Sequence, residues 1–324
     1  MGNSMRAAVW MGGREFRIED RPEPEPGPGE VRVRVHACGV CLTEVHTLDG
    51  LIGNFKPPRV VGHEYGGTIE AIGPDVTGLE IGMAVACGGQ GGFAEQIVIP
   101  ANWAFPIPAG IPVEQAAQVE PLLCCLSAIK QSEIAPGATV LITGAGPMGL
   151  MLIQLARNAG ASRVIVSELI PERRALALKL GADAAIDSRD VAVREAVTPF
   201  SEGGVDLAFE TAGHPVPLAD CAGAVKEGGM IVMVGVHPAT ARLELDLYTF
   251  HRRNLTLRGS YGGVAGLSFE KAANSLGQID LESLVSHRFD LVDIAEAFDI
   301  ARTGRGLKVL VGAGIDHQPV GANG

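Results

Sequence analysis

The sequence predicts an α/β protein of two domains, a β-rich domain and a doubly wound parallel sheet. Its 324 residues exceed the length that usually builds one core. Up to about residue 110, glycine and proline turns such as PEPGPGE separate short β-rich segments with little helical periodicity. Strands then alternate with helices, which is typical of a parallel sheet.

Five strands are expected in the first domain, each bounded by turn signals. These are Ala7–Trp10, Val31–Ala37, Tyr65–Ile72, Ala84–Ala86 and Phe93–Ile99. The pattern changes at Val113–Gln131, where a helix is predicted.

Six strands follow, the full count for a doubly wound dinucleotide-binding sheet. They are Thr139–Thr143, Arg163–Ser167, Ala184–Asp187, Val205–Glu210, Met230–Gly235 and Leu255–Ser260. The remaining chain is expected to return to the first domain. It contains predicted helices at Phe269–Leu276 and Ile294–Ala301 and predicted strands at Val285–Phe289 and Lys308–Val311. The predicted domains are therefore residues 1–119, completed by 263–324, and residues 120–262.

Composition narrows the possible partners. The formal net charge of −11 disfavours a nucleic acid or an anionic membrane surface, which both attract basic faces. No apolar run reaches the length of a membrane span, and the N-terminus lacks a signal peptide's apolar stretch. The six cysteines are unevenly spaced and do not suggest a disulfide framework. We therefore expect a cytoplasmic protein.

A glycine-rich turn carries the clearest motif. In TVLITGAGPMGLMLIQLARNAG, Gly144 permits a tight turn, Gly146 lets the backbone approach a pyrophosphate, and Gly149 allows close packing of helix on strand. Pro147 and Met148 open a helix whose N-terminus attracts phosphate. Because the turn follows a strand, opens a helix and heads six alternating strands, it predicts a nicotinamide dinucleotide site.

The second strand of this sheet ends at Glu168. A carboxylate there accepts hydrogen bonds from the adenosine ribose and repels a 2′-phosphate, which favours NAD. Arg173 and Arg174 lie nearby, however, and an arginine can receive the 2′-phosphate of NADP. Gly235, at the end of a later strand, is a further candidate coenzyme contact.

The segment HACGVCLTEVH contains a CxxC pair, Cys38 and Cys41. A redox role would need a thioredoxin-like βαβ setting, and a structural zinc would need a second cysteine pair; the sequence offers neither. GVCLTEVH, followed by VVGHEYGGTIEAIG, instead resembles the zinc-dependent medium-chain alcohol and polyol dehydrogenases, particularly their sorbitol dehydrogenase-like branch. The resemblance extends over almost the whole chain, through VDLAFETAG to the closing GLKVLV. It implies a GroES-like first domain and a Rossmann second domain.

The resemblance also implies a catalytic zinc held by Cys41 and His63. For the third ligand, VEPLL matches the glutamate of the polyol branch, which indicates Glu120; Cys124, one helical turn onward, is the rival. Glu64 matches the glutamate that lies beside the metal and can exchange with bound water. A zinc site with one open position lowers the pKa of a bound hydroxyl, so that an alkoxide can donate hydride to the nicotinamide.

Three further roles follow from the same resemblance. Thr43 takes the alcohol proton, His46 releases it to solvent, and Glu44 orients His63 from behind. Each residue taken singly has an ordinary structural explanation; their common spacing favours the functional one. The other histidines have no motif around them and are expected to be structural or surface residues; they are His36, His214, His237, His251 and His287.

The sequence departs from the family in two places. After GMAVA the chain continues directly as CGGQGGFAEQIVIP, so the lobe that holds a second, structural zinc is deleted and Cys87 is left without a role. No arginine matched to polyol recognition follows the last strand, where the chain reads RGSYGGVAG. We therefore expect one zinc, NAD, a small alcohol or polyol substrate, and a homodimer or homotetramer.

Two alternatives stay open at this stage. Zinc-free quinone or enoyl reductases of the same superfamily also lack the structural lobe, although they lack the Cys41, His63 and Glu120 set as well. A non-catalytic NAD(H)-binding protein could keep the fold. Zinc content separates the first alternative from a zinc-dependent dehydrogenase, and turnover of an alcohol separates the second.

Overall fold

The structure is a computed structural model, which describes residues 4–53, 55–262, 267–315 and 318–319. The chain divides into two compact units: unit 1 contains Met1–Pro121 and Ser268–Gly324, and unit 2 contains Leu122–Leu267. Unit 1 is rich in β-structure and unit 2 is a parallel α/β sheet, so the predicted α/β class is confirmed.

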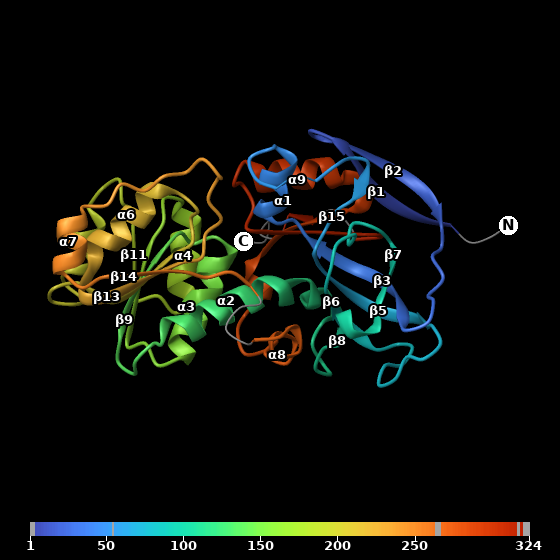
Figure 1. Ribbon diagram of the computed structural model, residues 1–324, viewed down its shortest axis with the longest axis horizontal. Coiled ribbons are helices and arrows are strands. Elements are labelled where there is room, and N and C mark those ends of the chain that lie inside the picture. Colours follow the sequence, from blue (N-terminus) through green and yellow to red (C-terminus); the bar gives the residue numbers. More distant parts are fainter. Residues whose placement is uncertain (1–3, 54, 263–266, 316–317, 320–324) are drawn as a thin grey trace. The chain divides into compact units, whose positions relative to one another are not determined.

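Unit 1 is built on two sheets, which can be followed in Figure 1. The larger has the strand order β17-β15-β16-β3-β5-β6-β8, with β7 paired to β3, and the smaller has the order β2-β1-β4. The strands are β1 (Ser4–Gly12), β2 (Glu15–Pro22), β3 (Glu30–Gly39), β4 (Arg59–Val60), β5 (Glu64–Ile72), β6 (Ala84–Cys87), β7 (Gln96–Pro100), β8 (Ala104–Pro106), β15 (Val285–Asp290), β16 (Lys308–Gly312) and β17 (Gln318–Pro319).

The helices of unit 1 are short. They are α1 (Leu42–Leu48), α8 (Phe269–Ala273) and α9 (Ile294–Arg302), with short 3-10 turns at Ala101–Trp103, Val113–Gln118, Glu282–Leu284 and Leu291–Asp293. The sequence did not predict α1, because its seven residues give too short a window for helical periodicity. It also missed β2, whose charged residues occupy an edge of the small sheet.

The single helix predicted over Val113–Gln131 was partly wrong. Val113–Gln118 forms a 3-10 turn, and the α-helix α2 begins only at Val119 and ends at Ser132. Pro121 explains the break, because proline has no N–H to donate and is tolerated only in the first turn of an α-helix.

Two other predicted bounds also needed correction. The strand predicted at Phe93–Ile99 begins as β7 only at Gln96, after an isolated bridge between Ala94 and Ala7. The helix predicted at Phe269–Leu276 ends at Ala273 as α8.

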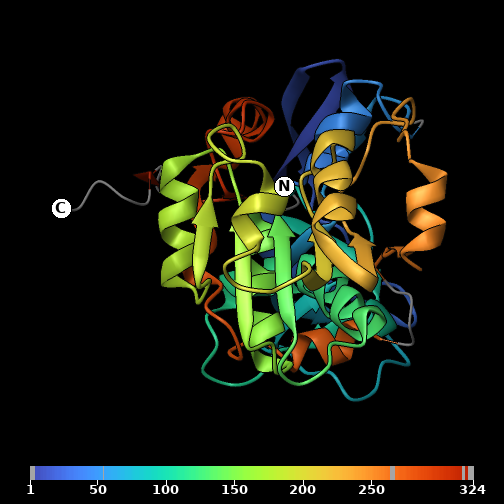
Figure 2. The ribbon, with the colours of Figure 1, turned by 90° about the vertical axis from the view of Figure 1, so that its left-hand side faces the viewer.

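Unit 2 contains a six-stranded parallel sheet with the order β11-β10-β9-β12-β13-β14 (Figure 2). Its strands are β9 (Thr139–Thr143), β10 (Arg163–Ser167), β11 (Ala184–Ile186), β12 (Val205–Glu210), β13 (Val225–Met233) and β14 (Thr256–Gly259). Its further helices are α3 (Pro147–Asn158), α4 (Pro171–Lys179), α5 (Val193–Val197), α6 (Pro215–Ala224) and α7 (Leu247–Arg252). All six predicted strands are present, although β13 begins five residues earlier than expected.

The strand order determines where unit 2 can bind a ligand. The chain runs from β9 outward to β11 on one side and from β12 outward to β14 on the other, so the order reverses between β9 and β12. Both strands of this pair are almost entirely buried. In doubly wound sheets, ligands bind outside the carboxyl ends of the strands at this reversal.

Each unit has its own apolar core. In unit 1, side chains such as Val33, Ile69 and Phe298 pack together with less than 2% exposure. In unit 2, Leu141, Ile165 and Val205 form the corresponding centre. Within the described part of the chain, no helix is long and apolar enough to cross a membrane.

Candidate metal centre and coenzyme site

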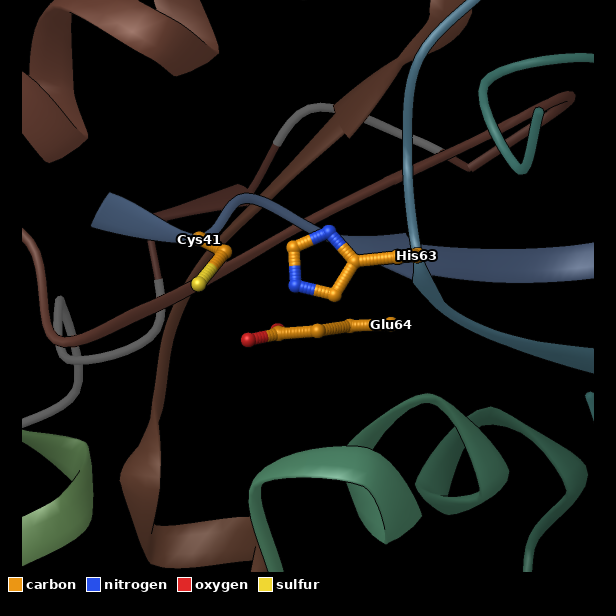
Figure 3. Close-up of side chains that lie close together, drawn as sticks. All are labelled: Cys41, His63 and Glu64. Carbon is orange, nitrogen blue, oxygen red and sulfur yellow. The ribbon is translucent and has the colours of Figure 1, made fainter. Parts of the chain in front are cut away.

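Cys41, His63 and Glu64 form a cluster of possible metal ligands in unit 1. One ligand atom from each residue lies within 4.8 Å of the others, and Figure 3 shows the three side chains pointing toward one another. Cys41 is the N-cap of α1, and Glu64 is the first residue of β5. Thiolate, imidazole and carboxylate are the donors that zinc takes in proteins.

Glu44 fixes the orientation of His63. Its Oε1 accepts a bond from His63 Nδ1 at 2.9 Å and another from the Gly62 backbone N–H at 2.7 Å. Nδ1 therefore carries a proton, which leaves Nε2 as the nitrogen available to a metal ion. A hydrogen-bonded carboxylate behind a ligand histidine is the usual arrangement that sets its tautomer.

Two glycines give these side chains their space. A Cβ on Gly62 would lie 2.8 Å from Cys38 Sγ and 2.9 Å from the backbone nitrogen of Phe93. The φ angle of Gly62 is +105°, which also disfavours any other residue. A Cβ on Gly39 would lie 2.3 Å from the Glu64 carboxylate. Both positions therefore require glycine if His63 and Glu64 are to keep their places.

Lys308 is a candidate site residue that the sequence did not indicate. Its Nζ lies 2.5 Å from Glu64 Oε2, and both side chains are almost completely buried. Burial alone lowers the pKa of Lys308, but Glu64, Cys41, the hydrogen bond and Glu120 together raise it. A charged residue inside the apolar run of GLKVLV was the available signal, because lysine is rarely buried unless it is paired.

The protein groups around His63 favour positive charge. Burial alone lowers the pKa of His63, but hydrogen bonds to Cys41 and Glu44 and their charges raise it to about 12. Glu44 Oε2 is buried and lacks a hydrogen-bond partner among the described residues. A divalent cation would replace the proton in this field, so the donor set fits zinc on charge as well as on ligand chemistry.

Thr43 and His46 lie on the same helix, α1, as Glu44. Thr43 is half-buried, and its carbonyl accepts the hydroxyl of Thr47 at 2.7 Å. His46 Nδ1 is buried without a partner in the described chain. Burial lowers the pKa of His46, with Asp49 opposing it, so the ring is neutral near pH 7 and can accept a proton.

Glu120 lies in the first turn of α2 and is not part of the Cys41–His63–Glu64 cluster. It belongs to unit 1, and its charge contributes to the raised pKa of Lys308. Cys124 follows one turn later and belongs to unit 2. The structure therefore brings Glu64 to the two candidate ligands Cys41 and His63. Glu120 acts on the charge of Lys308, which is paired with Glu64.

In unit 2, the glycine turn joins β9 to α3. Gly144 has φ of +97°, and a Cβ on Gly149 would lie only 1.9 Å from the Gly144 carbonyl oxygen. A Cβ on Gly146 would meet no atom within 4 Å. Helix α3 starts at Pro147 without a side-chain cap, so the N–H groups of its first turn, including that of Met148, can bind an anion.

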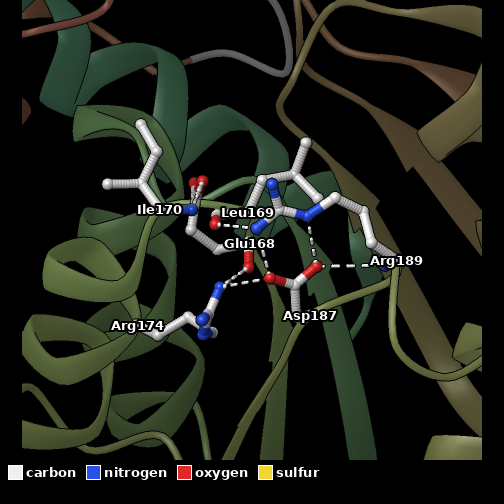
Figure 4. A network of polar contacts seen from close by, with 6 residues as sticks. All are labelled: Glu168, Leu169, Ile170, Arg174, Asp187 and Arg189. Carbon is white, nitrogen blue, oxygen red and sulfur yellow. Dashed lines mark hydrogen bonds and ion pairs between the residues drawn. The ribbon is translucent and has the colours of Figure 1, made fainter.

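Glu168 braces this turn through its carboxylate; Figure 4 shows Glu168 together with its neighbours Leu169 and Ile170. Its carboxylate is buried and accepts the backbone N–H of Ala145 at 2.7 Å and that of Ile170 at 2.9 Å. Each carboxylate oxygen has a second lone pair, so the group can still accept bonds from a ribose.

Arg174 and Arg189 are paired with Asp187 at distances of 3.0 and 2.5 Å (Figure 4). They also donate to the carbonyl oxygens of Glu168 and Leu169, respectively.

Two other candidate coenzyme contacts lie around this site. Burial lowers the pKa of Arg173, and the charge of Glu168 opposes this shift. Gly235 follows β13, and a Cβ there would lie 2.3 Å from the Gly213 nitrogen.

Comparisons with known proteins identify the family of the chain. The alcohol dehydrogenase GroES-like domain family matches residues 27–109, and the zinc-binding dehydrogenase family matches residues 147–277. The chain is 31% identical to sorbitol dehydrogenase of Bacillus subtilis (strain 168), over 95% of this chain and 97% of that protein. It is 33% identical to L-threonine 3-dehydrogenase of Pyrococcus horikoshii, over 85% and 89% of the two chains.

A solved structure shows the same likeness in three dimensions. A putative zinc-binding dehydrogenase from Sinorhizobium meliloti 1021, bound to NADP, superposes with a TM-score of 0.90 at 30% identity, over 95% of this chain and 99% of that one. The predicted family is thus confirmed. This chain belongs to the zinc-binding medium-chain dehydrogenase family and is an NAD(P)-linked alcohol or polyol dehydrogenase.

Proposed function

We propose that this protein oxidises a secondary alcohol or polyol with NAD, using one zinc ion held in unit 1. The convergence of Cys41, His63 and Glu64 supports this proposal most directly. The relatives named for sorbitol and L-threonine support the substrate class, because both compounds carry a secondary hydroxyl group.

Four residues of unit 1 would bind the zinc ion or lie directly beside it. Cys41 and His63 would supply sulfur and nitrogen, Glu120 would be the third ligand, and Glu64 would be a carboxylate able to exchange there. Bound zinc supplies Lewis-acid polarisation of the alcohol hydroxyl, and bound coenzyme supplies a hydride acceptor. Lys308 holds Glu64 at its other side.

Residues of α1 would transfer the alcohol proton to solvent. Thr43 accepts it from the alcohol hydroxyl, and His46, kept neutral by its lowered pKa, releases it to water. Glu44 holds the His63 ring in the orientation in which Nε2 would face a bound ion.

Unit 2 would bind the coenzyme, with the pyrophosphate at Gly144, Gly146 and Gly149 and the adenosine ribose at Glu168. A negative charge at Glu168 disfavours a 2′-phosphate, and Asp187 already neutralises Arg174. These features support NAD over NADP, although the Sinorhizobium meliloti relative is bound to NADP.

Metal analysis combined with a substrate screen tests the proposal. Elemental analysis should find one zinc per chain, and a panel of alcohols, polyols and sugars should reveal a compound that reduces NAD. Cys41→Ser should lose zinc and turnover together, whereas Cys87→Ser, at a buried cysteine outside the cluster, should retain both. Zinc-free protein that still oxidises an alcohol would contradict the proposed mechanism.

We also propose a homo-oligomer in the cytoplasm. The net charge and the uneven cysteine spacing support the location. Light scattering of the purified protein should give a mass of two or four chains; a monomer would contradict the oligomer.

A further inference from the structure

Glu210 is a buried carboxylate that the proposed mechanism does not use. It is the last residue of β12 and has no exposed surface. Its Oε1 accepts the backbone N–H of Gly213 at 2.7 Å. Its Oε2 has no hydrogen-bond partner among the described residues. A buried oxygen left unpaired is costly, so its surroundings need an explanation.

A second buried atom without a hydrogen-bond partner among the described residues lies close to it. His237 Nε2 lies 3.7 Å from Glu210 Oε2 and is itself buried without a hydrogen bond in the described chain. The other ring nitrogen, Nδ1, is 3.1 Å from the carbonyl oxygen of Gly235. A carbonyl only accepts, so Nδ1 must carry a proton.

This geometry requires one more proton. If His237 were neutral and Glu210 ionised, a nitrogen lone pair and a carboxylate oxygen would face each other in a buried place. One proton removes the conflict, either as a carboxylic acid that donates to Nε2 or as an imidazolium that donates to Oε2. The pair therefore binds one proton between its two members.

The other titratable groups around Glu210 do not supply that proton. On α6, burial raises the pKa of Cys221 to about 12, so its thiol is neutral, and burial also raises the pKa of Asp220. His214 caps α6 through its own Nδ1, which accepts the backbone N–H of Val216. On the flanking strands, the register partners of Glu210 are the uncharged Thr143 and Met233. Burial raises the pKa of Glu210 itself, opposed by His237 and by backbone N–H groups.

The pair connects two segments at the carboxyl edge of the sheet. The backbone of Glu210 accepts the N–H groups of Val234 and Gly235, and a Cβ on Gly235 would lie 2.9 Å from the Glu210 carboxylate. The next residue, Thr211, donates to the carbonyl oxygens of Thr143 and Gly144, at the start of the glycine turn. The backbone carbonyl of Glu210 thus anchors the start of segment 235–237, and its carboxylate lies beside the His237 end of that segment.

This edge belongs to the nicotinamide half of a dinucleotide site. Glu168, which is placed to read the adenosine ribose, follows β10 on one side of β9, and Glu210 ends β12 on the other. The two halves of a doubly wound sheet each take one mononucleotide.

We propose that Glu210 and His237 share one proton, and that this proton holds segment 235–237 in the position that the nicotinamide half of the coenzyme requires. The two residues are positioning residues. The inference rests on the NAD(P)-linked activity and adds a regulation of the coenzyme site by pH. When pH rises through the apparent pKa of the free pair, binding must take up a proton, so the dissociation constant rises by up to tenfold for each pH unit.

Fluorescence titration of the full-length protein with NADH, between about pH 6 and pH 9, tests the proposal. Glu210→Gln keeps an acceptor for Gly213 and places an amide donor opposite His237 without a titrating group. It should therefore abolish the rise in the NADH dissociation constant. His237→Gln, whose amide can donate to the carboxylate, should do the same and serves if Glu210→Gln does not fold. The matched control is His251→Gln, at an exposed histidine of α7, which should keep the wild-type profile.

A second ligand separates the nicotinamide side from the rest of the site. ADP-ribose lacks the nicotinamide, so its dissociation constant should not follow the wild-type NADH profile. A rise for NADH that persists in both glutamine variants, or a flat wild-type profile, would overturn the proposal. If wild-type protein binds ADP-ribose but not NADH, the nicotinamide placement fails. If it binds neither ligand, the proposed coenzyme site fails, and this inference fails with it.

Discussion

Replacement of Lys308 by methionine would leave the Glu64 carboxylate buried and without its partner. The two side chains are 5% and 2% exposed, so water cannot replace the lost ammonium group. Removal of one member of a buried ion pair costs about 3–5 kcal/mol, whereas an exposed pair is worth about 0–1 kcal/mol. For Lys308→Met we expect the loss of about 3–5 kcal/mol that is typical of a buried pair. It should be seen in zinc-free protein, where no other cation can balance Glu64.

Urea unfolding measures this loss in unit 1 alone, because both tryptophans, Trp10 and Trp103, belong to it. With a slope of about 2 kcal/mol per molar urea, the midpoint should fall by about 1.5–2.5 M. The folded pKa of Lys308 is raised, so its contribution is complete below the unfolded lysine pKa and is lost only as pH rises through the folded value. Measurement at neutral pH therefore reports the fully formed pair.

Three comparisons make this prediction strict. Zinc-loaded Lys308→Met should lose less stability, because the ion then balances Glu64. The double variant with Glu64→Gln should recover much of the loss, since no charge remains buried. Arg17→Met, which removes the exposed pair with Glu15, should change stability by less than about 0.5 kcal/mol. A loss below about 1 kcal/mol in zinc-free Lys308→Met would refute the reasoning.

Three further predictions concern the coenzyme and the proton path. Glu168→Ala should lower the preference for NAD over NADP, measured as a ratio of kcat/KM, by about 10- to 100-fold, the worth of a lost charged hydrogen bond; an unchanged ratio would contradict the assignment. Gly149→Ala should lower the melting temperature, because its methyl group would overlap the Gly144 carbonyl oxygen, whereas Gly146→Ala, with open space around it, should keep the melting temperature and weaken only NADH binding. In the wild-type protein, alcohol oxidation should slow as pH falls through the lowered pKa of His46, because the protonated ring can no longer accept a proton. His46→Gln should abolish this dependence on acidic pH. The same decline in the variant would exclude His46 from the proton path.

Much of the architecture could be predicted because it leaves local signals. The parallel strands of unit 2 are continuous apolar runs between turns, and the glycine turn after β9 is a contiguous motif. The start of α2 was predicted too early. The apolar pattern over Val113–Gln131 suggested one helix, although Pro121 already indicated that an α-helix must begin close to it. The helix α1 is fixed by its contacts in unit 1 more than by its own seven residues.

The site was harder to predict, because its charges pair over long distances in the sequence. Lys308 and Glu64 are separated by 244 positions, and nothing in either local pattern indicates the other. Glu210 and His237 are closer along the chain, but Glu210 ends β12 and His237 lies in the segment after β13, so the parallel pairing of these strands brings them together. Residue types could be singled out from the sequence, whereas their partners depend on the tertiary fold.

Gly39 and Gly62 have a consequence for how this site could be lost during evolution. Neither residue offers a ligand, yet any side chain at Gly39 would push against Glu64, and any side chain at Gly62 would push against Cys38 and Phe93. A descendant could therefore keep Cys41, His63 and Glu64 unchanged and still drift into a protein without metal. When related sequences are classified as metal-binding or metal-free, Gly39 and Gly62 should therefore be examined together with the candidate ligands.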